Sequence, residues 1–181
     1  MTGRWMLGVG LLALGLACGG GGAIGARTEG GAEATSAYPG TEEGARQLLL
    51  DVRTGDAVAL TRALKPTSAD YAAYFDAASA EKAEAAYEAL WSDPKAVISA
   101  DPENTELKLS SATTEELLAQ GEAASAFPGG YREAAAHLQP GLTVYRWKYT
   151  KPGEDLGMAY DGLVYLNGHW AWFPKPWKVL R

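Results

Sequence analysis

Apolar positions follow two different spacings along the chain, and these spacings separate a helical part from a strand-rich part. Between residues 41 and 92 apolar side chains recur every three or four residues, which places them on one face of a helix. The clearest case is a helix expected to start at Ser79, with the stripe Ala83, Ala86, Tyr87, Leu90 and Trp91.

Capping residues set the ends of the other expected helices. Thr41 precedes a helix that Gly55 closes, and Asp56 precedes a short helix that Pro66 ends. Thr67 and Asp70 have the spacing of a capping box before a third helix. Further along, the sequence predicts a strand at 105–110, a short helix after Thr113 and a helical piece at 131–138.

Residues 142–181 predict an antiparallel meander. Strands are expected at 142–150, 157–166 and 169–173, and Asn167-Gly168 between the last two is a favoured type I′ hairpin turn. A two-residue turn fixes the register, so the expected pairs are Tyr165 with Trp170, Leu163 with Trp172, Val164 with Ala171 and Gly162 with Phe173.

A glycine inside a strand indicates a bulge or bend, so we expect one at Gly162. Alternation places Met158, Tyr160 and Leu166 on the face of Val164. Both sheet faces are then apolar. Since helices easily cover only one of them, something else is expected to bury the second.

The expected fold class is therefore α+β, with N-terminal helices packed on a bent antiparallel sheet of about four strands that ends in a β-meander. Helices followed by a sheet that closes on Asn167-Gly168-His169-Trp170 resemble the nuclear transport factor two-like superfamily. That resemblance implies a cone-shaped, cystatin-like α+β domain over residues 41–181. The superfamily holds both enzymes and binding domains, and the resemblance implies no particular activity here.

The N-terminus has the pattern of an export signal. Arg4 is followed by an apolar run from Trp5 to Ala17, about 13 residues long and shorter than a membrane span. The run ends at Cys18, the only cysteine, in a stretch that resembles a lipobox although Gly15 stands where leucine is usual. An exported protein with one thiol favours acylation of that thiol. Ordinary secretion with cleavage after Ala17 and an uncleaved anchor are the alternatives.

The sequence thus predicts a lipoprotein signal peptide at 1–17, a lipidated Cys18 with a glycine-rich tether to residue 40, and one globular domain at 41–181. The tether has too few bulky apolar residues to pack, and as a flexible coil it would reach on the order of 25 Å. The expected location is the cell envelope, on the periplasmic or outer-surface side of a membrane that holds the lipid.

Charge and motifs exclude several function classes. The chain has 16 Lys and Arg against 22 Asp and Glu, a net charge of −6, which argues against nucleic acid as a partner. Metal-ligand spacing and cofactor motifs are absent from the sequence, so no metal and no cofactor is expected.

The sequence offers one candidate surface and two candidate bases. The surface, for a ligand or partner, consists of five aromatic side chains of the meander: Tyr145, Trp147, Tyr165, Trp170 and Trp172. The alternative is that these rings pack in the core or at a dimer interface. Asp161 lies in an apolar strand where its pKa could be raised, although pairing with Arg146 or Lys148 is the simpler interpretation. His169 follows the turn and is expected at the surface.

Three hypotheses follow. The missing catalytic constellation favours a non-catalytic, lipid-anchored envelope domain that binds a ligand or an envelope protein. The alternatives are a cone-fold enzyme of the isomerase or dehydratase kind that uses Asp161 or His169, and a structural envelope homodimer that associates through an open sheet face.

The lipid anchor is directly testable. In cells fed a labelled fatty acid, Cys18→Ser is expected to abolish acyl labelling and to release the chain from membranes, because the thiol is the acylated group. Labelling that persists in Cys18→Ser, or a variant that stays with the membrane fraction, would contradict the lipoprotein prediction.

Overall fold

The computed structural model describes residues 37–181, so Cys18, the signal and most of the predicted tether lie outside the described residues. These described residues form one compact unit. Its fold is α+β: helices come first, and a four-stranded antiparallel sheet follows in the order β1-β2-β3-β4. The expected fold class is therefore confirmed.

Within residues 37–181, four helices precede the sheet, and the predicted capping residues begin them. They are α1 (Glu42–Thr54), α2 (Ala57–Ala63), α3 (Ser68–Tyr74) and α4 (Ala80–Ser92). The Thr41 hydroxyl accepts from the Gly44 amide, and the Asp56 carboxylate accepts from the Ala59 amide. Each cap satisfies an amide that the first helical turn leaves free.

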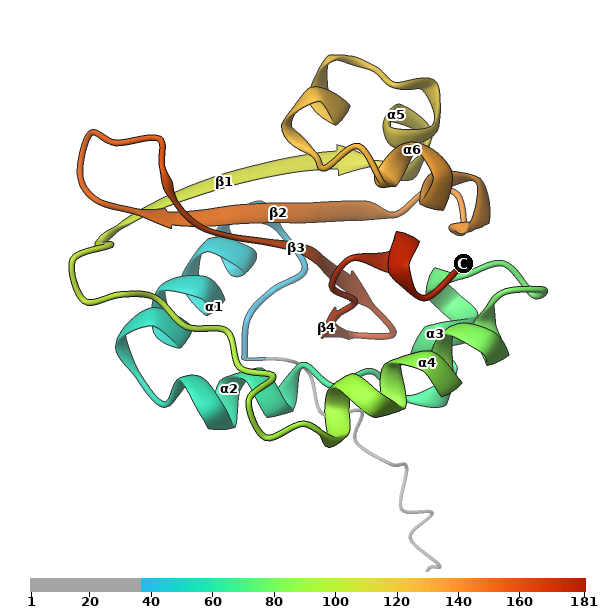
Figure 1. Ribbon diagram of the computed structural model, residues 1–181, viewed down its shortest axis with the longest axis horizontal. Coiled ribbons are helices and arrows are strands. Elements are labelled where there is room, and N and C mark those ends of the chain that lie inside the picture. Colours follow the sequence, from blue (N-terminus) through green and yellow to red (C-terminus); the bar gives the residue numbers. More distant parts are fainter. Residues whose placement is uncertain (1–36) are drawn as a thin grey trace, which may run out of the picture. The chain divides into compact units, whose positions relative to one another are not determined.

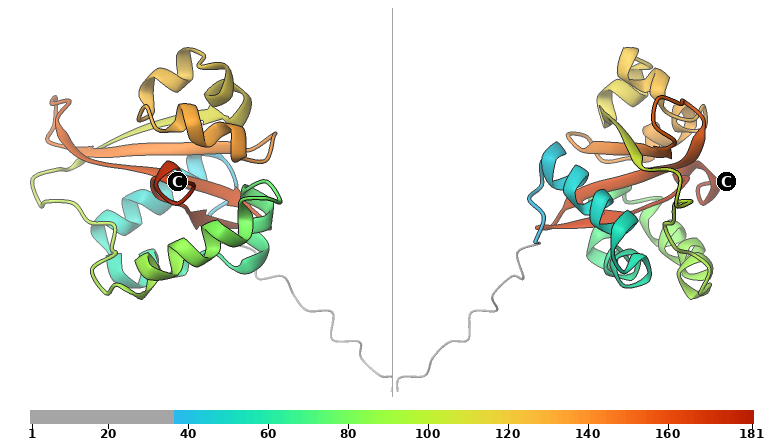
Figure 2. Two further views of the ribbon diagram at one scale, coloured as in Figure 1. Left: turned by 45° about the vertical axis from the view of Figure 1, so that its right-hand side comes forward. Right: turned by 90° about the vertical axis from the view of Figure 1, so that its left-hand side faces the viewer.

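The strands are β1 (Glu106–Thr113), β2 (Thr143–Thr150), β3 (Gly157–Leu166) and β4 (His169–Trp172). Between β1 and β2 the chain forms α5 (Thr114–Ala119), η1 (Glu122–Ala126), α6 (Tyr131–Ala134) and η2 (Ala135–His137). After β4 comes the short helix η3 (Pro176–Lys178). Figures 1 and 2 show α1 to α4 on one side of the sheet and α5 and α6 on the other.

The predicted hairpin register is confirmed. Leu163 pairs with Trp172, Val164 with Ala171, and Tyr165 with Trp170. Asn167 and Gly168 both have positive φ, 51° and 82°, as a type I′ turn requires.

The bulge expected at Gly162 is also present. Tyr145 pairs with Leu163 but the next residue, Arg146, pairs with Asp161, so Gly162 is the extra residue in β3. Its φ is 86°, and its carbonyl accepts from the Phe173 amide at 2.8 Å. An extra residue shifts the alternation of side chains by one position.

This shift corrects one sequence prediction. Tyr160 pairs with Trp147 and the two rings stack, with centroids 5.3 Å apart, so Tyr160 lies on the Trp147 face and not on the face of Val164. Met158 pairs with Tyr149, so Met158 also lies on the Trp147 face. The prediction was wrong because strict alternation was carried through the bulge.

The expectation that something outside the helices must bury the second sheet face is also wrong. Val144, Val164 and Leu166, all on that face, are buried within the chain itself. The α5–η2 segment lies over this face (Figure 1), and α5 and η1 both contact β1. The apolar face therefore gives no evidence of a partner.

The packed domain begins before Thr41. The Tyr38 hydroxyl donates to Asp51 at 2.8 Å, and the Tyr38 carbonyl accepts from the Trp170 indole at 3.1 Å. Tyr38 thus belongs to the domain although the sequence pattern placed it in the tether. Within residues 37–181 no helix has both the length and the apolar character needed to cross a membrane.

Two glycines with positive φ provide a test of the bulge. Gly141 (φ 79°) has open space where a Cβ would lie, whereas a Cβ on Gly162 would overlap the Phe173 carbonyl oxygen. We expect Gly141→Ala to cost about 1–2 kcal/mol of unfolding free energy and Gly162→Ala about 3 kcal/mol or more. Urea unfolding measures both, and equal losses would show that the Gly162–Phe173 contact is not required.

Candidate functional site

Four of the five candidate surface aromatics are buried in the core. Tyr145, Trp147, Trp170 and Trp172 have relative exposures of 6, 1, 2 and 5%, and only Tyr165 is half-buried. Trp147 stacks on Tyr160, and Trp170 packs edge-on against both Tyr145 and Tyr165. The rings therefore lie where the core-packing alternative placed them, and they form no exposed stacking surface.

Trp170 lines a cavity of about 270 Å³ that His169 also lines, and the ring of Trp172 lines a larger cavity of about 350 Å³. The Trp172 indole N–H donates to the Asp161 carbonyl at 2.9 Å, and its ring meets Trp91 edge-on. The structure thus brings Trp172 and Asp161, two of the residues singled out in the sequence, to one place.

His169 lies elsewhere and has a structural contact. Its Nε2 is 3.0 Å from Oδ2 of Asp70, a fully buried carboxylate that also accepts from Asn167 and from the Thr67 amide and hydroxyl. Burial acts to raise the pKa of Asp70, but these hydrogen bonds outweigh it and lower the pKa. His169 thereby ties the hairpin turn to the start of α3, and it does not line the cavity that Asp161 lines.

The other histidine, His137, lies beside a serine and an aspartate. Its Nδ1 is 3.3 Å from Ser79 Oγ and 3.1 Å from Asp76 Oδ2. A catalytic triad needs the two partners on opposite ring nitrogens, so that the base can take the serine proton while the carboxylate holds the ring. Since both contacts use Nδ1, this group joins η2 to the start of α4 and is not a nucleophile site.

The cavity of Trp172 and Asp161 forms because β4 is shorter than β3. β4 pairs only with Leu163–Leu166, so residues 157–161 of β3 have a partner strand on the β2 side alone. Helix α4, residues 95–97 and the C-terminal segment (residues 173–181) surround this edge and leave a cavity of about 350 Å³. Its lining is mainly apolar and includes Tyr87, Leu90, Val97, Tyr160, Trp172 and Val179.

Asp161 is a buried carboxylate in this lining, with a relative exposure of 5%. Its Oδ1 accepts from the Lys175 amide at 2.8 Å and from the Tyr131 hydroxyl at 3.2 Å. Burial raises the pKa of Asp161, and these two hydrogen bonds, with the charges of Lys175 and Arg146, offset only part of that rise.

The simpler interpretation of Asp161, pairing with Arg146 or Lys148, holds only in part: Arg146 is its cross-strand neighbour and lowers its pKa, but no ion pair of Asp161 is formed within residues 37–181. The Lys148 ammonium donates to the Asp155 carbonyl. The bulge at Gly162 leaves the Asp161 carboxylate beside Tyr131 of α6 and the backbone of Lys175.

The C-terminal segment is held against the cavity by backbone contacts. The Phe173 amide donates to Gly162, the Pro174 carbonyl accepts from the Tyr87 hydroxyl at 3.0 Å, and the Lys175 amide donates to Asp161. Lys175 has a left-handed backbone, with φ 53° and ψ 56°. Such a conformation costs a non-glycine residue on the order of 1–2 kcal/mol, and the Asp161 hydrogen bond offsets this cost.

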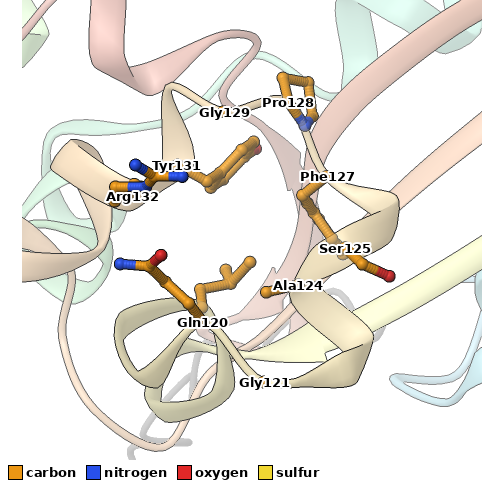
Figure 3. Close-up of a pocket in the computed structure, with 10 residues that line it drawn as sticks. Gln120, Gly121, Ala124, Ser125, Phe127, Pro128, Gly129, Tyr131 and Arg132 are labelled. Carbon is orange, nitrogen blue, oxygen red and sulfur yellow. The ribbon is translucent and has the colours of Figure 1, made fainter.

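A further cavity of about 310 Å³ lies between α5, η1 and α6. Figure 3 shows Gln120 and Arg132 on one side of its opening, Phe127 and Ser125 on the other, and the ring of Tyr131 beside Arg132. Its polar side chains Gln120, Ser125 and Arg132 are all exposed, and it contains no buried charged group. The cavity at the β3 edge, with a buried carboxylate, is therefore the stronger candidate.

In residues 37–181 no group of three or more His, Cys, Asp or Glu side chains is arranged to hold a metal ion. Comparisons of the chain with protein-family models, with curated proteins and with solved structures found no match.

Several site residues could not be found from the sequence. Tyr131 and Lys175 contact Asp161 from positions 30 residues before and 14 residues after it, and no periodic pattern connects them. Asp161 itself was found because a lone carboxylate in an apolar strand is unusual.

The raised pKa of Asp161 predicts a pH effect on stability. The native carboxyl holds its proton to a higher pH than the unfolded one, which has the ordinary aspartate pKa of 3.8, so this group's stabilising contribution is full below that value and is lost as pH rises. In Asp161→Asn the amide oxygen can still accept both hydrogen bonds but does not titrate. The stability of Asp161→Asn relative to wild type should therefore increase between about pH 3 and about pH 7. Urea unfolding at several pH values measures it, and a constant difference would contradict the prediction.

Proposed function

We propose that this chain is a lipid-anchored protein of the cell envelope whose single domain binds a small, mainly apolar ligand in the cavity at the β3 edge. The observation that carries the proposal is the construction of this cavity. It is a mainly apolar space of about 350 Å³ next to a buried carboxylate, bounded by a segment that backbone hydrogen bonds hold in place. Small-molecule sites are typically concave, largely apolar and supplied with a few placed polar groups.

A ligand is better supported than a protein partner that binds the aromatic sheet. Four of the five proposed contact residues are buried, and the chain's own helices cover both sheet faces. A partner that needs those rings would have to unpack the core, whereas a small molecule can enter a space that already exists.

The lipid anchor and the resemblance to the nuclear transport factor two-like superfamily remain proposals from the sequence. Both agree with a binding function, because an anchored domain keeps its ligand near the membrane and the superfamily includes many non-catalytic binding domains.

One observation favours the second candidate, a cone-fold enzyme with Asp161 as a base. A carboxyl of raised pKa that lines a cavity is suited to accept a proton from a substrate. However, Oδ1 of Asp161 already holds Lys175 and Tyr131, which makes Asp161 a structural support of the cavity wall. Any activity of the purified domain that Asp161→Asn left unchanged would exclude this mechanism.

Filling the cavity tests the binding proposal. Ala159 lines it from the exposed edge of β3, so Ala159→Phe should occupy the space without disturbing buried packing. With residues 32–181, 1-octanol is expected to shift the Trp172 indole resonance in NMR spectra saturably in wild type and to have no effect in Ala159→Phe.

The matched control is Ala119→Phe, which adds the same ring at an exposed alanine of α5 that lines none of these cavities. This variant should bind the probe as wild type does. If Ala159→Phe, still folded, binds 1-octanol as well as Ala119→Phe does, the cavity is not the site.

A further inference from the structure

We infer that the ligand of the β3-edge cavity is a single-chain anionic amphiphile, with its apolar body inside the cavity and its anionic head group among Lys95, Lys175 and Lys178. This inference rests on the proposed function and adds the chemical class of the ligand to it.

The inference rests on which lysines have a partner for the ammonium group and which have none. All eight lysines of the chain lie in residues 37–181, and five of them have a partner for the ammonium group. Lys65, Lys108 and Lys151 pair with carboxylates, while Lys82 and Lys148 donate to backbone carbonyls.

The remaining three lysines are those that line the cavity. Within residues 37–181 the ammonium groups of Lys95, Lys175 and Lys178 have neither an ion pair nor a hydrogen bond. All three residues are exposed, in a protein whose net charge is −6. Cations gathered at one opening of an acidic protein attract an anion there and disfavour a cation.

The only carboxylate in the lining does not reverse this preference. Asp161 is buried, and its Oδ1 already accepts from the Lys175 amide and the Tyr131 hydroxyl. It acts as a positioning residue, because it fixes the backbone of the segment that carries Lys175 and Lys178. The exposed lysines, not Asp161, are then the charges that an entering head group meets.

The rest of the lining sets the size and polarity of the ligand body. A cavity of about 350 Å³ lies at the lower end of the roughly 300–1,000 Å³ range of small-molecule sites, so it suits a small ligand body. Trp172, Tyr160, Leu90 and Val97 contribute apolar walls. An alkyl or aryl body of that size would gain most of its affinity by leaving water, and the lysines would select the head group.

Three unbranched eight-carbon probes separate these contributions. Octanoate, 1-octanol and octylammonium have the same number of carbons and end in an anionic, a neutral and a cationic group, and calorimetry on residues 32–181 at low ionic strength gives each Kd. We expect octanoate to bind about tenfold more tightly than 1-octanol, and octylammonium to bind most weakly. The preference for octanoate should shrink as salt is added, whereas 1-octanol binding should change little.

Charge reversal at two of the three lysines tests their role. It leaves Lys175 unchanged, because the Lys175 amide donates the hydrogen bond to Asp161. Lys95→Glu/Lys178→Glu should lose the preference for octanoate and keep its affinity for 1-octanol. The control, Lys65→Glu/Lys151→Glu, changes the net charge equally but lies outside the cavity, so it should retain most of the preference.

The outcomes are distinguishable. If all three probes bind wild type equally, or if octylammonium binds best, the inference is overturned while the cavity remains a binding site. If both double variants lose the preference equally, it reflects net charge and the assignment to the cavity lysines is wrong. If none of the probes binds wild type, the proposed function itself fails.

Discussion

The backbone of Gly162 is the constraint on which the rest of the sheet depends. With φ at 86° and no Cβ, it accommodates one extra residue in β3 while its carbonyl bonds the Phe173 amide. That extra residue exchanges the faces of the positions before it, so Tyr160 stacks on Trp147 and the Asp161 carboxylate contacts Tyr131. Any side chain at position 162 would overlap the carbonyl of Phe173, so the bulge and the path of the chain after β4 are set together.

Asp161 shows how a buried charge can be used to shape a surface. Burying a carboxylate is costly, and here the cost is offset by donors from two segments far apart in the chain, Tyr131 in α6 and the backbone of Lys175. Few backbone hydrogen bonds of a helix or strand hold the C-terminal segment. Without the Asp161 acceptor, the backbone of Lys175 would therefore be free to leave its left-handed conformation. The cavity wall thus depends on this polar contact together with the packing of Phe173 in the core and of Trp177 against Tyr131.

Local signals predicted much of the fold and little of the site. Thr41 and the Asn167-Gly168 turn act through neighbours in sequence, so the α1 start and the β3–β4 register could be derived directly. The covered second sheet face could not, because the segment that covers it consists of short helices with weak periodicity. The aromatic residues illustrate the same limit: alternation identified Trp172 as facing one side of the sheet, but only the tertiary structure shows that it is buried and lines a cavity.

The contacts of Tyr38 have a mechanical consequence. If the chain is held to a membrane through Cys18, a pull on the anchor is resisted by the contacts of Tyr38, whose hydroxyl and carbonyl are bound to Asp51 and Trp170. That load would be borne by α1 and β4. The C-terminal segment, which walls the cavity, is at the opposite end of the described chain and is fixed by separate bonds to Gly162, Tyr87 and Asp161. Tension on the tether would therefore reach the core before it reached the cavity wall.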